Sequence, residues 1–302
     1  AFSKVRGSLT AQLSQDLDGT ILRIEVDAQP MADRSRLDAW LADNIGPVSF
    51  LPAQRDLRLA NFFVQDSIAL GEDLTLTLGG KLERNSYTGT EFQPNVRLAW
   101  SPADNALLWS AISRALRTPA RYDRDTYVPT GFAPVPFTIR GNPNFRSEKL
   151  IAYEIGYRMQ PSPRSSFSIS TFSNVYDDLR TFEPANPPVH PPPFNLYPFS
   201  FANMMEGHAW GVELWGAYSV NDNWRLSAGY KHLDQDLRRQ ADSRDTITRF
   251  GLTDPEHQFS LRSAMNFAHN LELDVSLRAV SAIASAKDSP PRQKIPGYAA
   301  VD

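Results

Sequence analysis

The sequence predicts an all-β protein, and within that class an antiparallel transmembrane β-barrel. Three observations support this prediction: polar and apolar residues alternate over long segments, short and long connections alternate, and no apolar run is long enough for a membrane-spanning helix. The alternation at residues 74–84 covers the roughly 9 to 11 residues that a strand needs to cross a bilayer, whereas strands of soluble sandwiches average about 5 to 6. Strand length therefore favours a membrane barrel.

Composition sets the outer limits of this prediction. The chain has 302 residues and no shift in composition that would mark a linker, so we expect one domain covering residues 1–302. Hydrophobic residues make up 41% of the chain and the mean hydropathy is -0.38, as expected for strands with one lipid-facing and one lumen-facing side. A net charge of -3 argues against a nucleic-acid partner. The absence of cysteine excludes disulfides and thiolate metal sites.

The N-terminal part is predicted to hold two strands and a long loop. The strands cover residues 4–13 and 20–28, around a turn at 16–19 whose Asp and Gly residues suit a tight connection. Residues 30–56 show no clean period, so we expect a surface loop there with at most one helical turn, at 37–41.

Alternation is clear from residue 62 to residue 100. Between Leu74 and Leu82, leucines occupy one parity while polar residues occupy most of the other, and residues 96–100 repeat the pattern. A polar turn at 71–73 joins this region to the strand before it. Asp66 interrupts the apolar parity of that preceding strand, so its outward face is less sharply defined.

Later segments repeat the pattern as pairs of strands joined by short turns. The predicted strands are 149–159, 165–177, 210–218, 224–233, 258–267 and 271–278, with turns at 161–163, 221–223 and 269–270. With a less regular strand at 107–117, about twelve full strands result.

Long loops separate these pairs. They are predicted at residues 118–147, 179–205 and 235–255, and only the connection at 88–91 departs from the alternation of short and long. Outer-membrane barrels place short turns at the periplasmic end and long loops at the extracellular end, whereas sandwiches and propellers do not sort loops by length. We expect that sorting here. Aromatic residues near strand ends are expected to form interfacial girdles; they include Trp100, Tyr157, Tyr218 and Trp224.

The alternation also predicts a curved, tilted sheet with two different faces. The concave face is expected to carry Thr75, Lys81, Glu83, Arg97, Glu154, Glu213, Arg262 and Asp274. The convex face, towards lipid, is expected to carry Leu76, Leu78, Leu98, Ile155, Leu214, Leu261, Val275 and Leu277.

Catalytic chemistry finds little support. The five histidines show no metal-ligand spacing and no serine lies in a nucleophile elbow, so we expect no catalytic residues, no metal site and no cofactor. An outer-membrane hydrolase would need a paired base and nucleophile. The carboxylates of Asp123 and Asp125, or of Asp234 and Asp236, could bind calcium or simply be solvated.

The segment from Arg117 to Phe145 is the richest candidate for ligand binding. It combines arginines with aromatic residues, and the candidate contacts are Arg117, Arg121, Tyr122, Arg124, Tyr127 and Arg140. Guanidinium groups beside aromatic rings suit an anionic, partly flat ligand, which they bind by bidentate hydrogen bonds and stacking. Lipopolysaccharide phosphates and loop carboxylates are the alternative partners for these arginines.

Several segments, taken together and in order, resemble one family. They are FVQDSI at 63–68, GGKLE at 79–83, SRALRTPARYDRD at 113–125, GNPNFRSEKLIAYEIGYR at 141–158, GVELWGAY at 211–218 and IPGYAAVD at 295–302. In this order they resemble the C-terminal part of the β-barrel of TonB-dependent outer-membrane receptors. The resemblance implies a Gram-negative outer membrane, lipopolysaccharide contacts and a TonB-type energy-coupling partner.

The resemblance also implies a function, which is energy-coupled uptake of a scarce nutrient. A ferric siderophore is the foremost candidate ligand, with cobalamin, haem or a glycan as alternatives. A passive porin or an adhesin is the rival class. The sequence shows no counterpart of the family's plug domain and stops at Asp302, before the strands that should complete the barrel. We therefore expect a partial barrel that neither inserts stably nor transports by itself.

Overall fold

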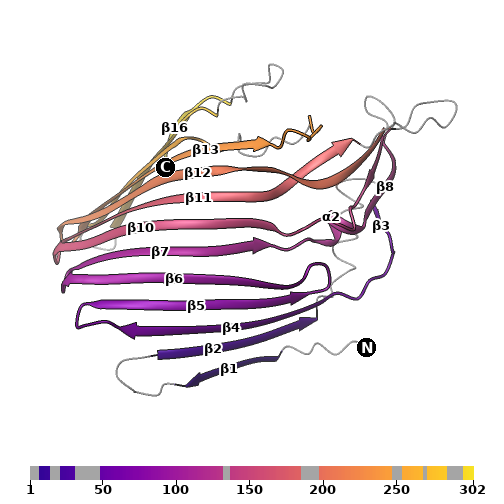
Figure 1. The fold of residues 1–302 in the computed structure, drawn as a ribbon. Helices are drawn as coiled ribbons and strands as arrows, with labels where there is room; N and C mark the ends of the chain where they lie inside the picture. Colours follow the sequence, from indigo (N-terminus) through magenta and orange to yellow (C-terminus); the bar gives the residue numbers. More distant parts are fainter. Residues whose placement is uncertain are drawn as a thin grey trace.

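A single curved sheet dominates the protein (Figure 1). The computed structural model describes residues 7–13, 21–30, 48–131, 137–184, 197–246, 254–267, 271–283 and 295–302. No helix in these ranges is long and apolar enough to cross a membrane. The predicted turn at 16–19 and the predicted helical turn at 37–41 lie outside them.

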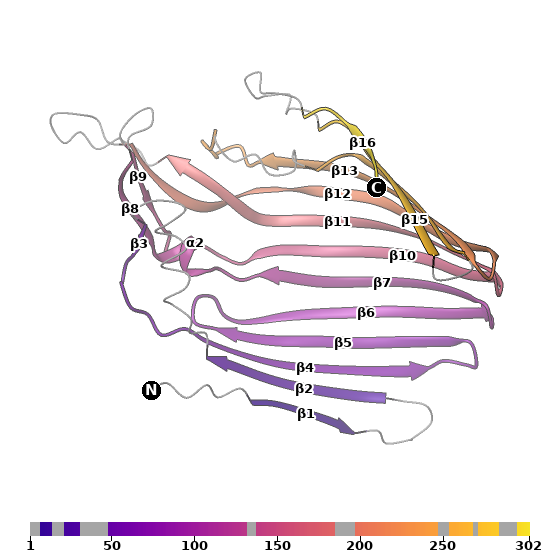
Figure 2. The ribbon, with the colours of Figure 1, turned by 180° about the vertical axis from the view of Figure 1, so that it is seen from behind.

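The main path of the sheet follows the order of the chain. Within the described residues its members are β1 (Gly7–Leu13), β2 (Ile21–Pro30), β4 (Arg58–Ala69), β5 (Leu74–Asn85), β6 (Gly89–Ala103), β7 (Ala106–Arg117), β10 (Glu148–Ser162), β11 (Ser165–Pro184), β12 (Tyr197–Asn221), β13 (Trp224–Arg239), β14 (His257–Phe267), β15 (Leu271–Val280) and β16 (Tyr298–Val301). Each pairs antiparallel with its neighbours, and among the described strands β1 and β16 form the two open edges (Figures 1 and 2).

Connections are sorted by end, as predicted. Short turns join β4 to β5, β6 to β7, β10 to β11 and β12 to β13 at one end, here called the short-turn end. The longer connections after β7 and β11 leave from the opposite end, the long-loop end (Figure 2). The β5–β6 turn also lies there and is the short exception. The predicted turn at His269 and Asn270 lies outside the described residues.

The strand register confirms the predicted sorting of side chains onto two faces. Leu76 lies opposite Leu98, and Leu261 lies opposite Leu277, so the predicted apolar residues continue from strand to strand on one face. This apolar face leaves large side chains uncovered; Ile155, for example, is 48% exposed. The opposite, polar face carries ion pairs; they include Lys81–Glu83, Glu213–Lys231 and Arg262–Asp274. Asp66, opposite Leu78, is a carboxylate on the apolar face.

The four predicted girdle residues lie on the apolar face near the short-turn end. Tyr157 and Phe167 pack across β10 and β11 with ring centroids 5.9 Å apart. The indole nitrogen of Trp224 donates to the Ser263 hydroxyl at 3.0 Å. Each ring therefore combines an apolar surface with a polar atom, which suits a membrane–water boundary.

Strands at the long-loop end run further than predicted. Residues 179–184 and 197–205 belong to β11 and β12, which still pair at Pro184 and Phe199, and β13 continues to Arg239. The prediction of loops at 179–205 and 235–255 is therefore wrong for the residues that belong to β11, β12 and β13. Beyond a bilayer no lipid imposes alternation, so the ladder can continue without a period of two in hydrophobicity.

A bulge bends β11 and β12 where they leave the regular part of the sheet (Figure 1). The register shifts between Tyr176 and Leu179, and Asp178 takes a positive φ of 57°. Gly207, opposite Tyr176, has a φ of 154°. A β carbon at Gly207 would lie 2.1 Å from the Asp236 carbonyl oxygen. Only glycine fits this backbone.

We predict that Gly207→Ala destabilises the β12–β13 pairing by about 3 kcal/mol, because it adds both a steric overlap and a strained φ. Urea unfolding followed by the heat-modifiable band on electrophoresis measures this. Gly216→Ala on the same strand is the matched control, since its β carbon would approach no atom more closely than 3.7 Å. Equal unfolding midpoints for the two variants would contradict the prediction.

Candidate functional site

The predicted ligand-binding loop is a folded subdomain at the long-loop end. It contains the short helix α2 (Arg121–Asp125) and the strands β8 (Thr126–Gly131) and β9 (Phe137–Arg140), and β3 (Ser49–Phe50) joins them. β9 runs parallel to the first residues of β12, while β8 pairs with β9 and β3. The predicted loop at 118–147 thus contains regular structure that anchors it to the main sheet (Figure 1).

Asp123 is the central anion of this subdomain. Its side chain is fully buried and accepts hydrogen bonds from Arg117 and Arg180, each at 3.1 Å. The backbone nitrogen of Ala120 donates a third bond at 2.9 Å. Arg117 also pairs with Glu148 at the start of β10. A buried carboxylate requires such compensation, so Asp123 ties α2 to β7 and β11.

Asp125 is a second buried anion with its own set of cations. Its carboxylate is 3.1 Å from Arg55 and 3.4 Å from Arg121, and it accepts the Tyr87 hydroxyl at 2.8 Å. Asn85 holds the β5–β6 turn by accepting the Tyr87 backbone N–H at 2.9 Å. Burial, reinforced by Asp125, raises the pKa of the Tyr87 phenol, which therefore remains a donor at physiological pH.

Arg124 binds backbone rather than a carboxylate. Its guanidinium donates to the Phe145 carbonyl at 2.8 and 2.5 Å and to the Tyr87 carbonyl at 2.7 Å, and burial lowers the pKa of this group. Gly141 lies against the same turn, where a β carbon would be 2.3 Å from the Arg124 carbonyl carbon. Gly141 also donates its N–H to Thr126 at 2.6 Å. The glycine allows the loop to close on α2.

The residues after Gly141 act as a clamp between α2 and β12. The Asn142 side chain donates to the Phe201 carbonyl at 2.8 Å, and its N–H donates to the Asp123 carbonyl at 2.9 Å. Phe145 is fully buried beneath the loop. The GNPNF segment therefore has a structural role in this fold.

Asn203 completes the clamp from the side of β12. Its amide accepts the Arg146 N–H at 2.8 Å and donates to the Asp178 carbonyl at 2.6 Å. The Asp178 carboxylate, which the β11 bulge presents, pairs with both Arg146 and Lys149. The bulge, the loop and the start of β10 thus form one connected network.

An aromatic cluster lies beside this network. Tyr122 and Phe201 have centroids 5.1 Å apart, Phe182 and Phe201 5.5 Å, and Phe182 stacks on Phe199 at 4.8 Å with planes at 6°. The Arg180 guanidinium lies 5.4 Å from the Phe201 centroid. This arrangement joins flat apolar surface to positive charge.

The six predicted contact residues fall into two groups. Arg117, Arg121 and Arg124 bind protein groups, and Tyr122 packs against Phe201. Arg140 is exposed and lies 5.5 Å from the Tyr127 ring centroid.

Sequence reasoning missed several residues of the site. Arg180, Phe182, Phe199, Phe201 and Asn203 belong to it, and the aromatic density of residues 182–201 was the available signal. Asp123 and Asp125, considered for calcium, are held by separate arginines. The described residues contain no group of three or more His, Cys, Asp or Glu side chains that could hold a metal.

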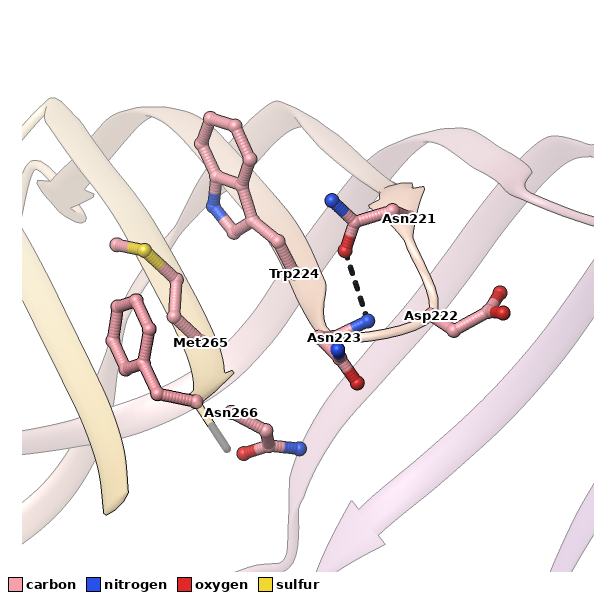
Figure 3. A pocket seen from close by; sticks show the side chains of 7 residues that line it. Asn221, Asp222, Asn223, Trp224, Met265 and Asn266 are labelled. Carbon is pink, nitrogen blue, oxygen red and sulfur yellow. Dashed lines mark hydrogen bonds between the residues drawn. The ribbon is translucent and has the colours of Figure 1, made fainter. Parts of the chain in front are cut away.

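A pocket of about 440 Å³ lies elsewhere, at the short-turn end (Figure 3). Its lining residues come from the β12–β13 turn and from β14; they are Asn221, Asp222, Asn223, Trp224, Met265, Asn266 and Phe267. The Asn223 N–H donates to the Asn221 side chain at 2.9 Å, which closes the turn (Figure 3). This pocket is remote from the predicted ligand residues.

We expect Asp123→Asn to loosen the subdomain around α2 by about 1 to 3 kcal/mol, because hydrogen bonds from two arginines lose their charged acceptor. Trypsin treatment of intact cells should then cleave at Arg121 and Arg124 faster than in the wild type, while the barrel stays heat-modifiable. Asp222→Asn is the control, since that carboxylate is 95% exposed in a turn. Unchanged cleavage in Asp123→Asn would show that the ion pairs do not hold the loop.

Comparison with known proteins places this geometry in a family. The family model described as TonB dependent receptor-like, beta-barrel, matches residues 6–302. The iron-regulated outer membrane virulence protein of Vibrio cholerae serotype O1 is 25% identical over 179 residues, which are 58% of this chain and 27% of that protein.

Solved structures of low sequence identity share the fold. The siderophore receptor PirA from Acinetobacter baumannii gives a TM-score of 0.68 at 14% identity, covering 98% of this chain and 46% of that one. A mutant of the ferric enterobactin receptor PfeA from Pseudomonas aeruginosa gives 0.69 at 15% identity, covering 98% and 44%.

The chain therefore spans less than half the length of these relatives. The family model matches nearly the whole chain, and the sorting of strands and loops agrees with it, so the match shows the family of this chain. This chain belongs to the TonB-dependent receptors of the Gram-negative outer membrane and forms a partial β-barrel of that family.

Proposed function

We propose that the chain is part of a receptor that binds a ferric siderophore at its extracellular end and imports it with energy from a TonB-type coupling protein. The names of the relatives support this: two are siderophore or ferric enterobactin receptors, and a third neighbour is the FrpB iron transporter from Neisseria meningitidis. The activity of the whole receptor is a proposal, because this chain covers 46% of the FrpB chain and similar shares of the others.

The observation that carries the proposal is the rigid surface of arginines and aromatic rings at the extracellular end. Phe182 and Phe199, both partly exposed, stack at 4.8 Å, whereas the adjoining Phe201 is buried and lies 5.4 Å from the partly exposed Arg180 guanidinium. A ferric siderophore commonly combines a net negative charge with planar chelating groups, and such a ligand gains from cation contact and from stacking. The internal ion pairs fix this surface before a ligand arrives, which lowers the entropy cost of binding.

We assign different roles to the six predicted residues. Arg140 and Tyr127 contact the ligand, because Arg140 is exposed and forms no ion pair with a described carboxylate. The other four position the surface: Arg117 and Arg121 neutralise Asp123 and Asp125, Arg124 binds loop carbonyls, and Tyr122 extends the aromatic cluster.

We also propose that residues 1–302 form one part of a larger closed barrel. The open edges at β1 and β16 then pair with further strands, since free backbone groups in lipid cost several kcal/mol each. The polar face lines the lumen of that barrel, and the lipopolysaccharide leaflet surrounds the extracellular end of the apolar face.

Growth tests check the proposed uptake. A strain lacking the gene should fail to grow on at least one ferric siderophore, ferric enterobactin included in the panel, and should regain growth with the gene restored. Purified receptor should bind a TonB-type coupling protein. Normal growth on every iron source, no coupling-protein binding and steady ion conductance would instead indicate a porin.

Arg140→Ala should weaken binding of the siderophore that supports growth by about 10- to 100-fold, because a hydrogen bond from a charged group contributes about 1.5 to 3 kcal/mol. Fluorescence titration of the purified receptor measures this. Arg225→Ala is the control, since Arg225 is exposed near the short-turn end of β13. Equal affinities for the wild type and Arg140→Ala would remove Arg140 from the site.

A further inference from the structure

Two histidines that are distant in sequence meet on the apolar face. His232 of β13 lies directly opposite His257 of β14, with ring centroids 4.9 Å apart and planes at 25°. The N–H of Leu233 donates to the Glu256 carbonyl, so Leu233 and Glu256, the next pair along the two strands, form a hydrogen-bonded pair. His232 and His257 therefore occupy a non-hydrogen-bonded position, where opposing side chains come closest. The backbone itself brings the imidazoles together.

Neighbouring side chains orient both rings. Trp210 packs edge-on against His232 at 5.0 Å, and its indole N–H donates to Asp234 at 3.1 Å. The Tyr230 hydroxyl forms a hydrogen bond of 2.9 Å with Nδ1 of His257. When this nitrogen carries the proton, the Nε2 of His257 presents its lone pair. A hydrogen bond of this kind is how proteins orient a metal-ligating histidine.

One ring nitrogen of His232 lacks a hydrogen-bond partner in the part of the chain that the structure describes. Its Nδ1 is buried and has no hydrogen-bond partner among the described residues. Such an orphaned polar atom costs free energy unless a ligand or water completes it. His257 is exposed and the His232 ring is half-buried, so a ligand reaches the pair from the side of His257.

The surrounding charges favour a cation over an anion. Asp234 and Asp236 follow His232 on the same face of β13, at its extracellular end. The next base on that face, Arg238, is 3.5 Å from Glu206. A phosphate would meet these carboxylates unfavourably, whereas a metal ion would be attracted. Imidazole nitrogen is a preferred ligand of zinc, copper and nickel ions.

We propose that His232 and His257 form a two-histidine site for a first-row transition-metal ion such as Zn²⁺ or Cu²⁺, at the extracellular edge of the lipid-facing surface. Zinc–nitrogen bonds of about 2.0 to 2.1 Å place two ligand nitrogens within about 4 Å of each other, so the rings must change rotamer from the stacked arrangement to point both lone pairs at one ion. Water completes the coordination, so the ion exchanges readily. The site is separate from the proposed siderophore surface and does not depend on it.

Metal titration of the receptor purified in detergent and stripped with a chelator tests the proposal. The electron paramagnetic resonance spectrum of bound Cu²⁺ should show two nitrogen ligands. Isothermal titration calorimetry should detect Zn²⁺ binding. His232→Gln and His257→Gln should each lower the Zn²⁺ affinity by about tenfold or more, and Tyr230→Phe by about tenfold. His208→Gln is the control: this exposed histidine lies on the same face of β12, opposite Asp236.

Three results would overturn the site. They are a Cu²⁺ spectrum with one nitrogen ligand or none, Zn²⁺ affinity unchanged in both His232→Gln and His257→Gln, or a loss confined to His208→Gln. The wild-type spectrum decides the question even if a histidine variant fails to fold. Heat-modifiable migration establishes that each variant compared is folded.

Discussion

The hydrogen-bonded ladder of the backbone is the constraint on which the rest of this structure depends. A bilayer offers no water to an N–H or C=O group, so each must be paired within the sheet, at a cost of several kcal/mol where it is not. Between its two edge strands, β1 and β16, the main sheet meets this requirement strand by strand. Because neighbours pair in register, most apolar residues of paired strands such as β5 and β6 or β14 and β15 fall on one face, and most polar residues fall on the other.

Outside the bilayer the same chain follows different rules. There the register shifts at the β11 bulge, β9 pairs parallel with β12, and charged residues are buried. Buried charges must still be compensated, which is why arginines surround Asp123 and Asp125. These ion pairs offset the cost of burying the carboxylates, and they also fix the geometry of the loop. The proposed ligand surface at the extracellular end depends on that fixed geometry.

Cross-strand pairing also creates sites that local sequence spacing conceals. His232 and His257 are separated by twenty-four residues of chain, yet the register of β13 and β14 makes them direct neighbours. Asn203 joins the bulge to the loop in the same way, across strands that are remote in sequence. Such contacts arise from the order and stagger of the strands, so a search for spaced motifs along the chain does not find them.

The two-residue period of hydrophobicity and the lengths of the connections were enough to predict the fold class, the sorting of short turns onto one end and the two faces of the sheet. They could do so because a strand alternates its side chains with a period of two wherever one side meets lipid. Beyond the bilayer the alternation no longer carries that information, so the sequence predicts a loop where the structure has strands at 179–184 and 197–205. Arg117, Arg121 and Arg124 were recognised as a group, but only the tertiary structure decided that they bind Asp123, Asp125 and loop carbonyls. The reason is that an arginine meets whatever carboxylate the folded chain brings within reach, and this depends on strand register and a bulge that no single segment specifies.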